Sequence, residues 1–101
     1  MYTCDRYLIL RITPDEGEPF NKLFATKAGG YLDGDSWRLN SGIVEVRDQD
    51  DYRYFVGESG SVYECRKGSY GIAGGSNHYV LDYLLARSEG KIEVLLEDPY
   101  V

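Results

Sequence analysis

The chain has 101 residues, of which 43% are hydrophobic and 14% are aromatic. This composition excludes a disordered chain, which needs low hydrophobicity, and the length predicts one domain covering residues 1–101. Seventeen acidic residues against eleven basic ones give a formal net charge of −6. Because proteins bind phosphate backbones mainly through Lys and Arg, this charge argues against direct nucleic-acid binding and favours a partner with a basic surface.

The N-terminal residues and the cysteine content indicate where in the cell the protein is expected. The segment 1–16 carries Asp5 and only a short apolar run, which does not fit a signal peptide. No run in the chain approaches the roughly 20 apolar residues of a membrane span. Two cysteines, Cys4 and Cys65, are too few for a disulfide framework. These features predict a cytoplasmic protein with reduced thiols that does not enter a membrane.

The first third of the chain predicts two strands and a loop. Residues 6–13 place Leu8, Leu10 and Ile12 on one face, as a half-buried strand does. Residues 14–19 form a turn-rich break. The segment 20–28 fits either a short helix or a strand, and we favour the second strand of a hairpin. Residues 31–42 predict a loop.

Three short runs follow, at 43–47, 52–56 and 61–66, separated by polar turns. They predict an antiparallel meander, in which Val44 and Val46 face the same way.

One helix is expected at about 77–89, capped by Ser76 or Asn77 and ended by Gly90. Its apolar stripe consists of Val80, Leu81, Leu84 and Leu85. Residues 91–97 alternate again and predict a last strand. The fold class is therefore α+β: an antiparallel sheet of five or six strands, with the helix packed on one face. The edge strands of such a sheet make a homodimer possible.

An acidic hairpin with adjacent aromatic residues is either a solvated turn or the first candidate binding surface. Carboxylates at this turn would steer a basic protein, and Tyr and Trp are enriched in binding hot spots. The predicted partner-binding residues are Glu45, Asp48, Asp50, Asp51, Trp37, Tyr52 and Tyr54.

A glycine-rich loop before the helix is the second candidate. Its glycines, at 68, 71, 74 and 75, match neither the dinucleotide fingerprint nor the NTPase phosphate loop. We interpret them first as a tight corner, where glycine permits positive φ angles. The alternative is a loop that binds an anion, a small ligand or a nucleotide through the helix N-terminus. Its residues would be Arg66, Lys67, Tyr70, Ser76 and Asn77.

A thiol enzyme is the remote alternative. Cys65, His78 and Asp82 are the one set of a nucleophile, a base and an orienting acid. The strand spacing of Cys65 favours a buried structural thiol instead, so we predict no catalytic residues. One His and two distant Cys lack the spacing of a zinc site, so we expect neither a metal nor a cofactor.

Two segments, SWRLNSGIVEV (36–46) and SGSVYECRKGSYG (59–71), together with the later VLDYLL, resemble small accessory proteins of tailed phages and prophages. In that pattern the position after Cys65 is often His, where this chain has Arg66. The resemblance implies a protein that acts by binding rather than catalysis. It leads us to expect an inhibitor of a host defence complex or nucleic-acid enzyme, as anti-CRISPR proteins are, which mimics nucleic-acid charge.

Overall fold

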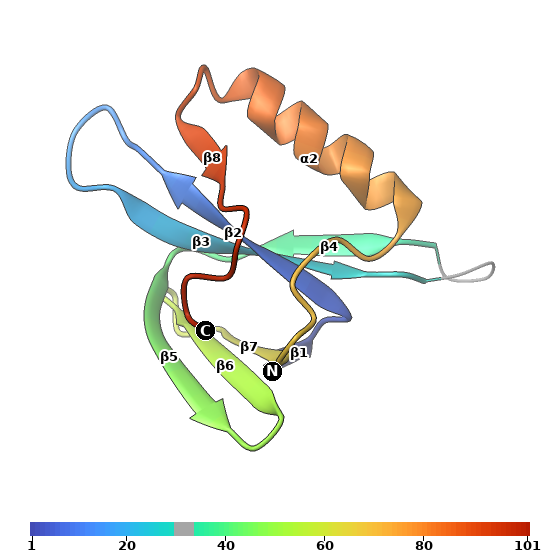
Figure 1. Cartoon of the computed structure of the whole chain (residues 1–101). Helices are drawn as coiled ribbons and strands as arrows, with labels where there is room; N and C mark the ends of the chain where they lie inside the picture. The colour runs from blue at the N-terminus through green and yellow to red at the C-terminus, as the bar shows by residue number, and fades with distance from the viewer. Residues whose placement is uncertain (30–33) are drawn as a thin grey trace.

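The computed structural model describes residues 1–29 and 34–101 and shows an α+β fold with two four-stranded sheets and one helix (Figure 1). Sheet A has the strand order β1-β7-β6-β5, and sheet B has the order β4-β3-β2-β8. The strands are β1 (Tyr2–Thr3), β2 (Arg6–Ile12), β3 (Phe20–Lys27), β4 (Ser36–Leu39), β5 (Ile43–Gln49), β6 (Tyr52–Gly57), β7 (Val62–Arg66) and β8 (Ile92–Val94), and the helix is α2 (Gly75–Arg87).

The prediction of a single sheet with five or six strands is wrong, although the meander within it is correct. Strands β5, β6 and β7 pair antiparallel in chain order. The hairpin β2–β3 instead belongs to sheet B, with β4 beyond β3 and β8 beyond β2. The segment 20–28 is a strand, as favoured, over Phe20–Lys27. Strand pairing depends on contacts between distant residues, which local alternation does not report.

Sheet B is the middle layer of three, between sheet A and α2. Tyr7 and Ile9 of β2 pack into the core shared with sheet A. Leu8 and Leu10 of the same strand pack on the other side, together with Leu81 of α2. Strand β2 is therefore buried on both faces, which makes its hydrophobic run continuous instead of alternating with polar residues.

Three strand predictions need correction. A strand, β4, lies within the predicted loop 31–42, of which positions 31–33 fall outside the described residues. The predicted strand 91–97 is paired only over Ile92–Val94. Val44 and Val46 do not face the same way, because the β5–β6 register shifts between Ile43 and Glu45. Such a bulge adds one residue to the strand, and it leaves Val44 65% exposed.

Helix α2 begins and ends two residues earlier than predicted, and a different residue caps it. Its apolar stripe is as predicted, with Leu81 buried at the centre. No side chain of the helix start caps it, and the N-cap position is Gly74. Asp35 accepts a hydrogen bond from the Ser76 backbone N–H at 3.0 Å instead. Gly74 has φ 84°, and a Cβ there would lie 2.5 Å from the Asp35 carboxyl carbon, so the position requires glycine.

The glycine-rich segment crosses from sheet A to the helix along the edge of β2. The Tyr7 N–H donates to the Ser69 carbonyl, and the Gly71 N–H donates to the Tyr7 carbonyl. Gly71 has φ 145°, and the Arg6 guanidinium occupies the space that a Cβ would fill, 2.5 Å away. This backbone conformation and close packing are those expected of a tight crossover corner.

The C-terminal segment 95–101 covers the open side of the core between the two sheets. The Leu95 N–H donates to the Ile9 carbonyl, and the Tyr100 ring packs against Phe55 at a centroid distance of 5.5 Å. The radius of gyration is 13.3 Å, close to the ~13 Å of a compact chain of this length. Among the described residues, no helix has both the length and the apolar character needed to cross a bilayer.

Candidate functional site

The outer face of sheet A is a surface on which the sequence places aromatic and charged side chains together. Alternation along β5, β6 and β7 sends one set of side chains into the core and the other outward. The strand register sets the outward residues in three cross-strand rows. We call this surface the hairpin face; its rows are Gln49–Tyr52–Arg66, Arg47–Tyr54–Glu64 and Glu45–Val56–Val62.

Two tyrosines form the centre of the hairpin face. The Tyr54 hydroxyl donates to Glu64 Oε2 at 3.0 Å, and this bond raises the pKa of Tyr54. The Arg66 guanidinium lies 5.9 Å from the centre of the Tyr52 ring. Beside Tyr54 is an open cavity of about 350 Å³, with Val56 and Val62 among its lining residues. An apolar and aromatic centre inside a charged rim is the usual anatomy of a protein-binding surface.

The four predicted acidic residues of the hairpin do not share one environment. Glu45 forms an ion pair with Arg47 of the same strand. Asp48 points to the inner side of the sheet and pairs with Arg53 at 2.7 Å. Among the described residues no ion pair involves Asp50 or Asp51, which form the exposed turn. Two of the four carboxylates, those of Asp50 and Asp51, therefore lie at the tip without an ion pair among the described residues.

Arg53 and Asp98 form a buried polar pair that ties sheet A to the C-terminal segment, and Asp48, whose side chain is 50% exposed, joins this pair from the surface. The Arg53 side chain, only 6% exposed, donates to Asp48 and also to Asp98 Oδ2 at 3.1 Å. Asp98 in turn accepts the hydrogen bond of the Tyr7 hydroxyl. The hydrogen bonds from Arg53 hold the pKa of Asp48 below its usual range. Asp48 therefore pairs within the fold, and sequence reasoning missed Arg53, Asp98 and Tyr7, because nothing local links them.

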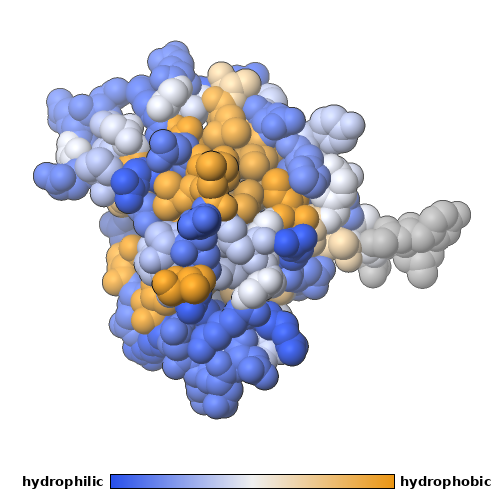
Figure 2. Space-filling view, viewed as in Figure 1, coloured by the Kyte–Doolittle hydropathy of each residue, from blue (hydrophilic) through white to orange (hydrophobic). Residues whose placement is uncertain are grey.

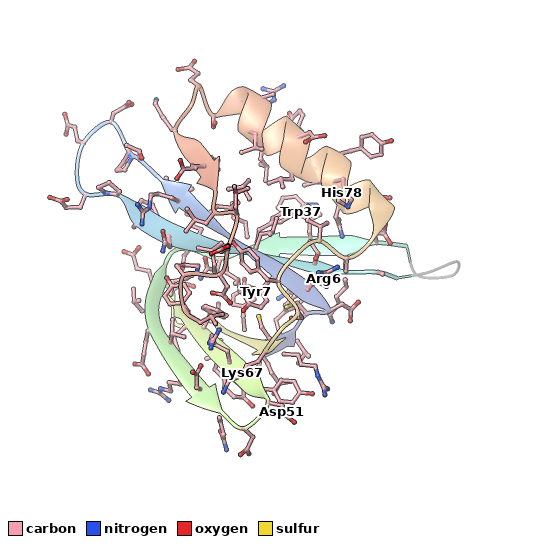
Figure 3. All side chains as sticks on the ribbon, viewed as in Figure 1. Arg6, Tyr7, Trp37, Asp51, Lys67 and His78 are labelled. Carbon is pink, nitrogen blue, oxygen red and sulfur yellow. The ribbon has the colours of Figure 1, made fainter. Side chains whose placement is uncertain are left out.

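Trp37 does not join the hairpin face. It lies in β4 of sheet B, opposite Thr26, and its ring is 5.8 Å from that of Phe24 in the core beneath α2. Figure 3 shows Trp37 near the helix and Asp51 at the far end of sheet A. The sequence had grouped Trp37 with Tyr52 and Tyr54 by proximity along the chain, and the two-sheet fold separates them.

The predicted ligand loop is divided between two places in the fold. Arg66 and Lys67 stay at the end of sheet A, where Lys67 Nζ is 4.0 Å from Asp48. Ser76 and Asn77 lie in the first turn of α2, beside Asp35. The Asp35 carboxylate already occupies the helix N-terminus, where an external anion would bind.

Two of the predicted loop residues satisfy the backbone of the protein itself. The Tyr70 hydroxyl accepts from the Ile9 N–H at 3.0 Å and donates to the Leu95 carbonyl at 2.7 Å. Asn77 is 1% exposed, and its amide donates to the Ala73, Ser36 and Lys27 carbonyls. Both side chains hold the crossover in place, and their polar groups are engaged inside the fold.

The proposed thiol-enzyme residues do not meet. Cys65 is fully buried in the core between the sheets, and its sulfur faces that of Cys4. His78 and Asp82 lie exposed on α2, which covers the opposite side of sheet B. Figure 3 shows His78 on the helix and Tyr7, which shares a core cluster with Cys65, well away from it near the centre of the molecule. The neighbour of Cys65 is a second thiol, from a residue sixty-one positions earlier in the chain.

Among the described residues, no group of three or more His, Cys, Asp or Glu side chains is arranged to hold a metal ion. A scan against protein-family models finds no matching family, and searches of curated proteins and of solved structures find no match.

Three tyrosines that pack in the core should make the stability of the fold fall at alkaline pH. Burial raises the pKa of Tyr7, Tyr63 and Tyr70 because the phenolate would lose its hydration, and the Asp98 carboxylate adds to the effect at Tyr7. In the unfolded chain these groups ionise near pH 10. Their contribution to stability is therefore complete below about pH 10 and is lost as pH rises from there through the raised pKa values.

We expect Tyr7, Tyr63 and Tyr70 to ionise late in an alkaline titration, because burial raises their pKa values. Their phenolate signal should appear together with the loss of the fold. Phenolate absorbance and circular dichroism, followed together during an alkaline titration, measure this directly. A single titration of all tyrosines with the circular dichroism unchanged would contradict it.

Proposed function

We propose that this protein is a non-enzymatic binding protein that inhibits a host protein by covering a basic surface with the hairpin face. The observation that carries the proposal is the coincidence of Tyr52 and Tyr54 with the sheet face that no described element covers. Sheet B is covered on both sides, by sheet A and by α2. The outer surface of sheet A is thus left for a partner.

The charge distribution supports a basic partner. Figure 2 shows apolar side chains gathered on the face beneath α2, whereas the end of the molecule at the β5–β6 turn is hydrophilic. That turn carries Asp50 and Asp51, and the whole chain has a formal net charge of −6. Exposed carboxylates at the tip would steer a Lys- and Arg-rich surface towards the tyrosines, which would supply the desolvated contact. The resemblance to phage accessory proteins favours a bacterial defence or nucleic-acid enzyme as the target.

Site-specific photocrosslinking tests this proposal. A benzophenone amino acid would replace Tyr54 in one variant and Tyr79 in the matched control. Tyr79 is 78% exposed on α2, on the other side of sheet B. In lysate of a bacterial host, we expect one salt-sensitive cross-linked product from position 54 and none from position 79. Cross-linking from position 79 alone, or equal cross-linking from both, would contradict the proposed surface.

The charge contribution is tested separately by the variant D50N/D51N. Asparagine is chosen at position 50 because Asp50 has φ 54°, a conformation that Asn tolerates and most other residues do not. We expect about a tenfold weaker association, mostly in the association rate, with a smaller salt dependence. Asp48 is left unchanged because it already pairs with Arg53. Unchanged affinity and salt dependence would exclude charge mimicry while leaving the tyrosine contact to the crosslinking test.

A further inference from the structure

Two buried thiols lie side by side at the edge of sheet A. The Cys4 and Cys65 sulfur atoms are 3.2 Å apart, and the two side chains are 6% and 0% exposed. The parallel pairing of β1 with β7 sets Thr3 opposite Glu64, and Cys4 and Cys65 are the next positions along. The Cys4 N–H continues this ladder by donating to the Glu64 carbonyl at 3.2 Å.

This arrangement meets the geometric requirement for a disulfide. Neighbouring strands are about 4.8 Å apart, within the Cα separation that disulfides span. Both sulfurs already point into the same part of the core, so small side-chain rotations would bring them to bonding distance. Cys4 and Cys65 are the two cysteines of the chain. A disulfide within the chain therefore has one possible pairing.

The two thiols are unequal in reactivity. The hydrogen bond from Cys65 lowers the pKa of the Cys4 thiol, and the Lys27 ammonium contributes in the same direction. The hydrogen bond to Cys4 and burial both raise the pKa of the Cys65 thiol. The more acidic thiol of such a pair is the one that forms the nucleophilic thiolate. Cys4 is therefore the attacking sulfur, and Cys65 is the one that resolves the product.

The low exposure of Cys4 limits the size of the oxidants that can reach its sulfur atom. Thr3 and Asp5, on either side of Cys4, line an open cavity of about 460 Å³ together with Lys27, whereas the Cys4 side chain packs into the core and does not line it. Strand β1 is an edge strand with two paired residues, whereas Cys65 lies within the longer strand β7. The Cys4 residue as a whole is only 6% exposed, so an oxidant as small as hydrogen peroxide is the kind that can reach its sulfur. A bulky disulfide such as oxidised glutathione could not approach it in line without displacing β1.

We propose that Cys4 and Cys65 form a redox-sensitive pair that a hydroperoxide closes into a disulfide joining β1 to β7. The Cys4 thiolate attacks one peroxide oxygen, and the O–O bond breaks. Sulfur is oxidised by two electrons to a sulfenic acid, and the departing hydroxide becomes water by taking a proton. The Cys65 sulfur then attacks the Cys4 sulfur, the S–O bond breaks, and the hydroxide leaves with the Cys65 proton as a second water. Two thiols and one hydrogen peroxide thus give one disulfide and two waters.

The disulfide would link the edge strand β1 covalently to β7 and so stabilise this edge of sheet A. It would close a long loop of the chain, from Cys4 to Cys65, and so restrict the unfolded state. It would also hold Tyr2 against Tyr63, whose rings meet edge to face at a centroid distance of 5.5 Å. We expect the melting temperature of the oxidised protein to rise by on the order of 10 °C above that of the reduced protein.

The test treats the whole reduced protein with hydrogen peroxide under native conditions. We expect a mass loss equal to two hydrogens, loss of both alkylatable thiols, and recovery of both after reduction. A non-reduced tryptic digest should link the peptide 1–6 to the peptide 54–66. The variant C65S, whose hydroxyl keeps a hydrogen-bond donor beside the Cys4 sulfur, should stop at a sulfenic acid, detected as the gain of one oxygen on the peptide 1–6. The variant C4A should leave Cys65 unreacted on the same timescale, and alanine is chosen there because the site is small and buried.

Several outcomes would overturn the proposal. One is a native protein that keeps both thiols, or that gains oxygen without losing two hydrogens. Another is a cross-link between two chains, or a disulfide that forms faster after denaturation than before it. An oxidised protein with an unchanged melting temperature would refute the proposed stabilisation by the disulfide. Equally fast closure by oxidised glutathione would refute the assignment to a hydroperoxide.

Discussion

Replacing Arg53 with methionine should lower the free energy of unfolding by about 3–5 kcal/mol. The Arg53 and Asp98 side chains are 6% and 5% exposed, and they pair at 3.1 Å. Methionine fills a similar volume but leaves the Asp98 carboxylate buried without its cation. Removing one partner of a buried pair costs far more than the pair contributes, because the remaining charge keeps its desolvation penalty.

The double variant R53M/D98N separates charge from packing. Asparagine keeps an oxygen for the Tyr7 hydroxyl and removes the buried charge. We expect it to recover most of the stability lost in R53M, as read from urea unfolding midpoints at constant m value. If the two substitutions instead destabilise additively, packing of the Arg53 side chain, rather than the ion pair, holds the C-terminal segment in place.

Replacing Phe55 with alanine should also cost about 3–5 kcal/mol, because it empties a fully buried aromatic site. Phe55 belongs to sheet A, but its ring packs against Tyr7 of sheet B at a centroid distance of 5.3 Å and against Tyr100. The loss should therefore appear in both sheets. Amide hydrogen exchange should show lower protection in β2 and β3 as well as in β6, with unfolding still a single transition.

The matched control is Val44→Ala in the neighbouring strand. Val44 is 65% exposed at the β5 bulge, so this change should alter stability by no more than about 0.5 kcal/mol. If F55A lowers protection in sheet A and leaves sheet B at its original protection, the two sheets are separate folding units, and the prediction of one domain fails.

The candidate site was predictable in part. The tyrosines at 52 and 54 and the acidic turn between β5 and β6 are local features, and the structure brings them to one end of sheet A. The pairing of Asp48 with Arg53 was not predictable, because the bulge at Val44 and the register of the hairpin decide which side of the sheet Asp48 occupies. Trp37 was misplaced because residues close in sequence entered different sheets.

The local conformation of each segment follows from its amino-acid pattern. The short runs 6–13, 43–47, 52–56 and 61–66, bounded by turn residues, place strands correctly, and the apolar stripe around Leu81 places the helix. The period of apolar residues decides conformation because it sets which side chains share a face, and that relation holds within a few residues.

Which layer each strand or helix face contacts depends on the tertiary structure. Leu8 and Leu10 face α2, whereas Tyr7 and Ile9 face sheet A. Strand β2 therefore contributes side chains to two hydrophobic cores. Asp35 caps a helix that begins forty residues later, and Cys4 faces a thiol of β7. These contacts join residues far apart in the chain, and their selection depends on the packing of three complete layers. No local pattern carries that information, because the contacts exist only once the layers have assembled.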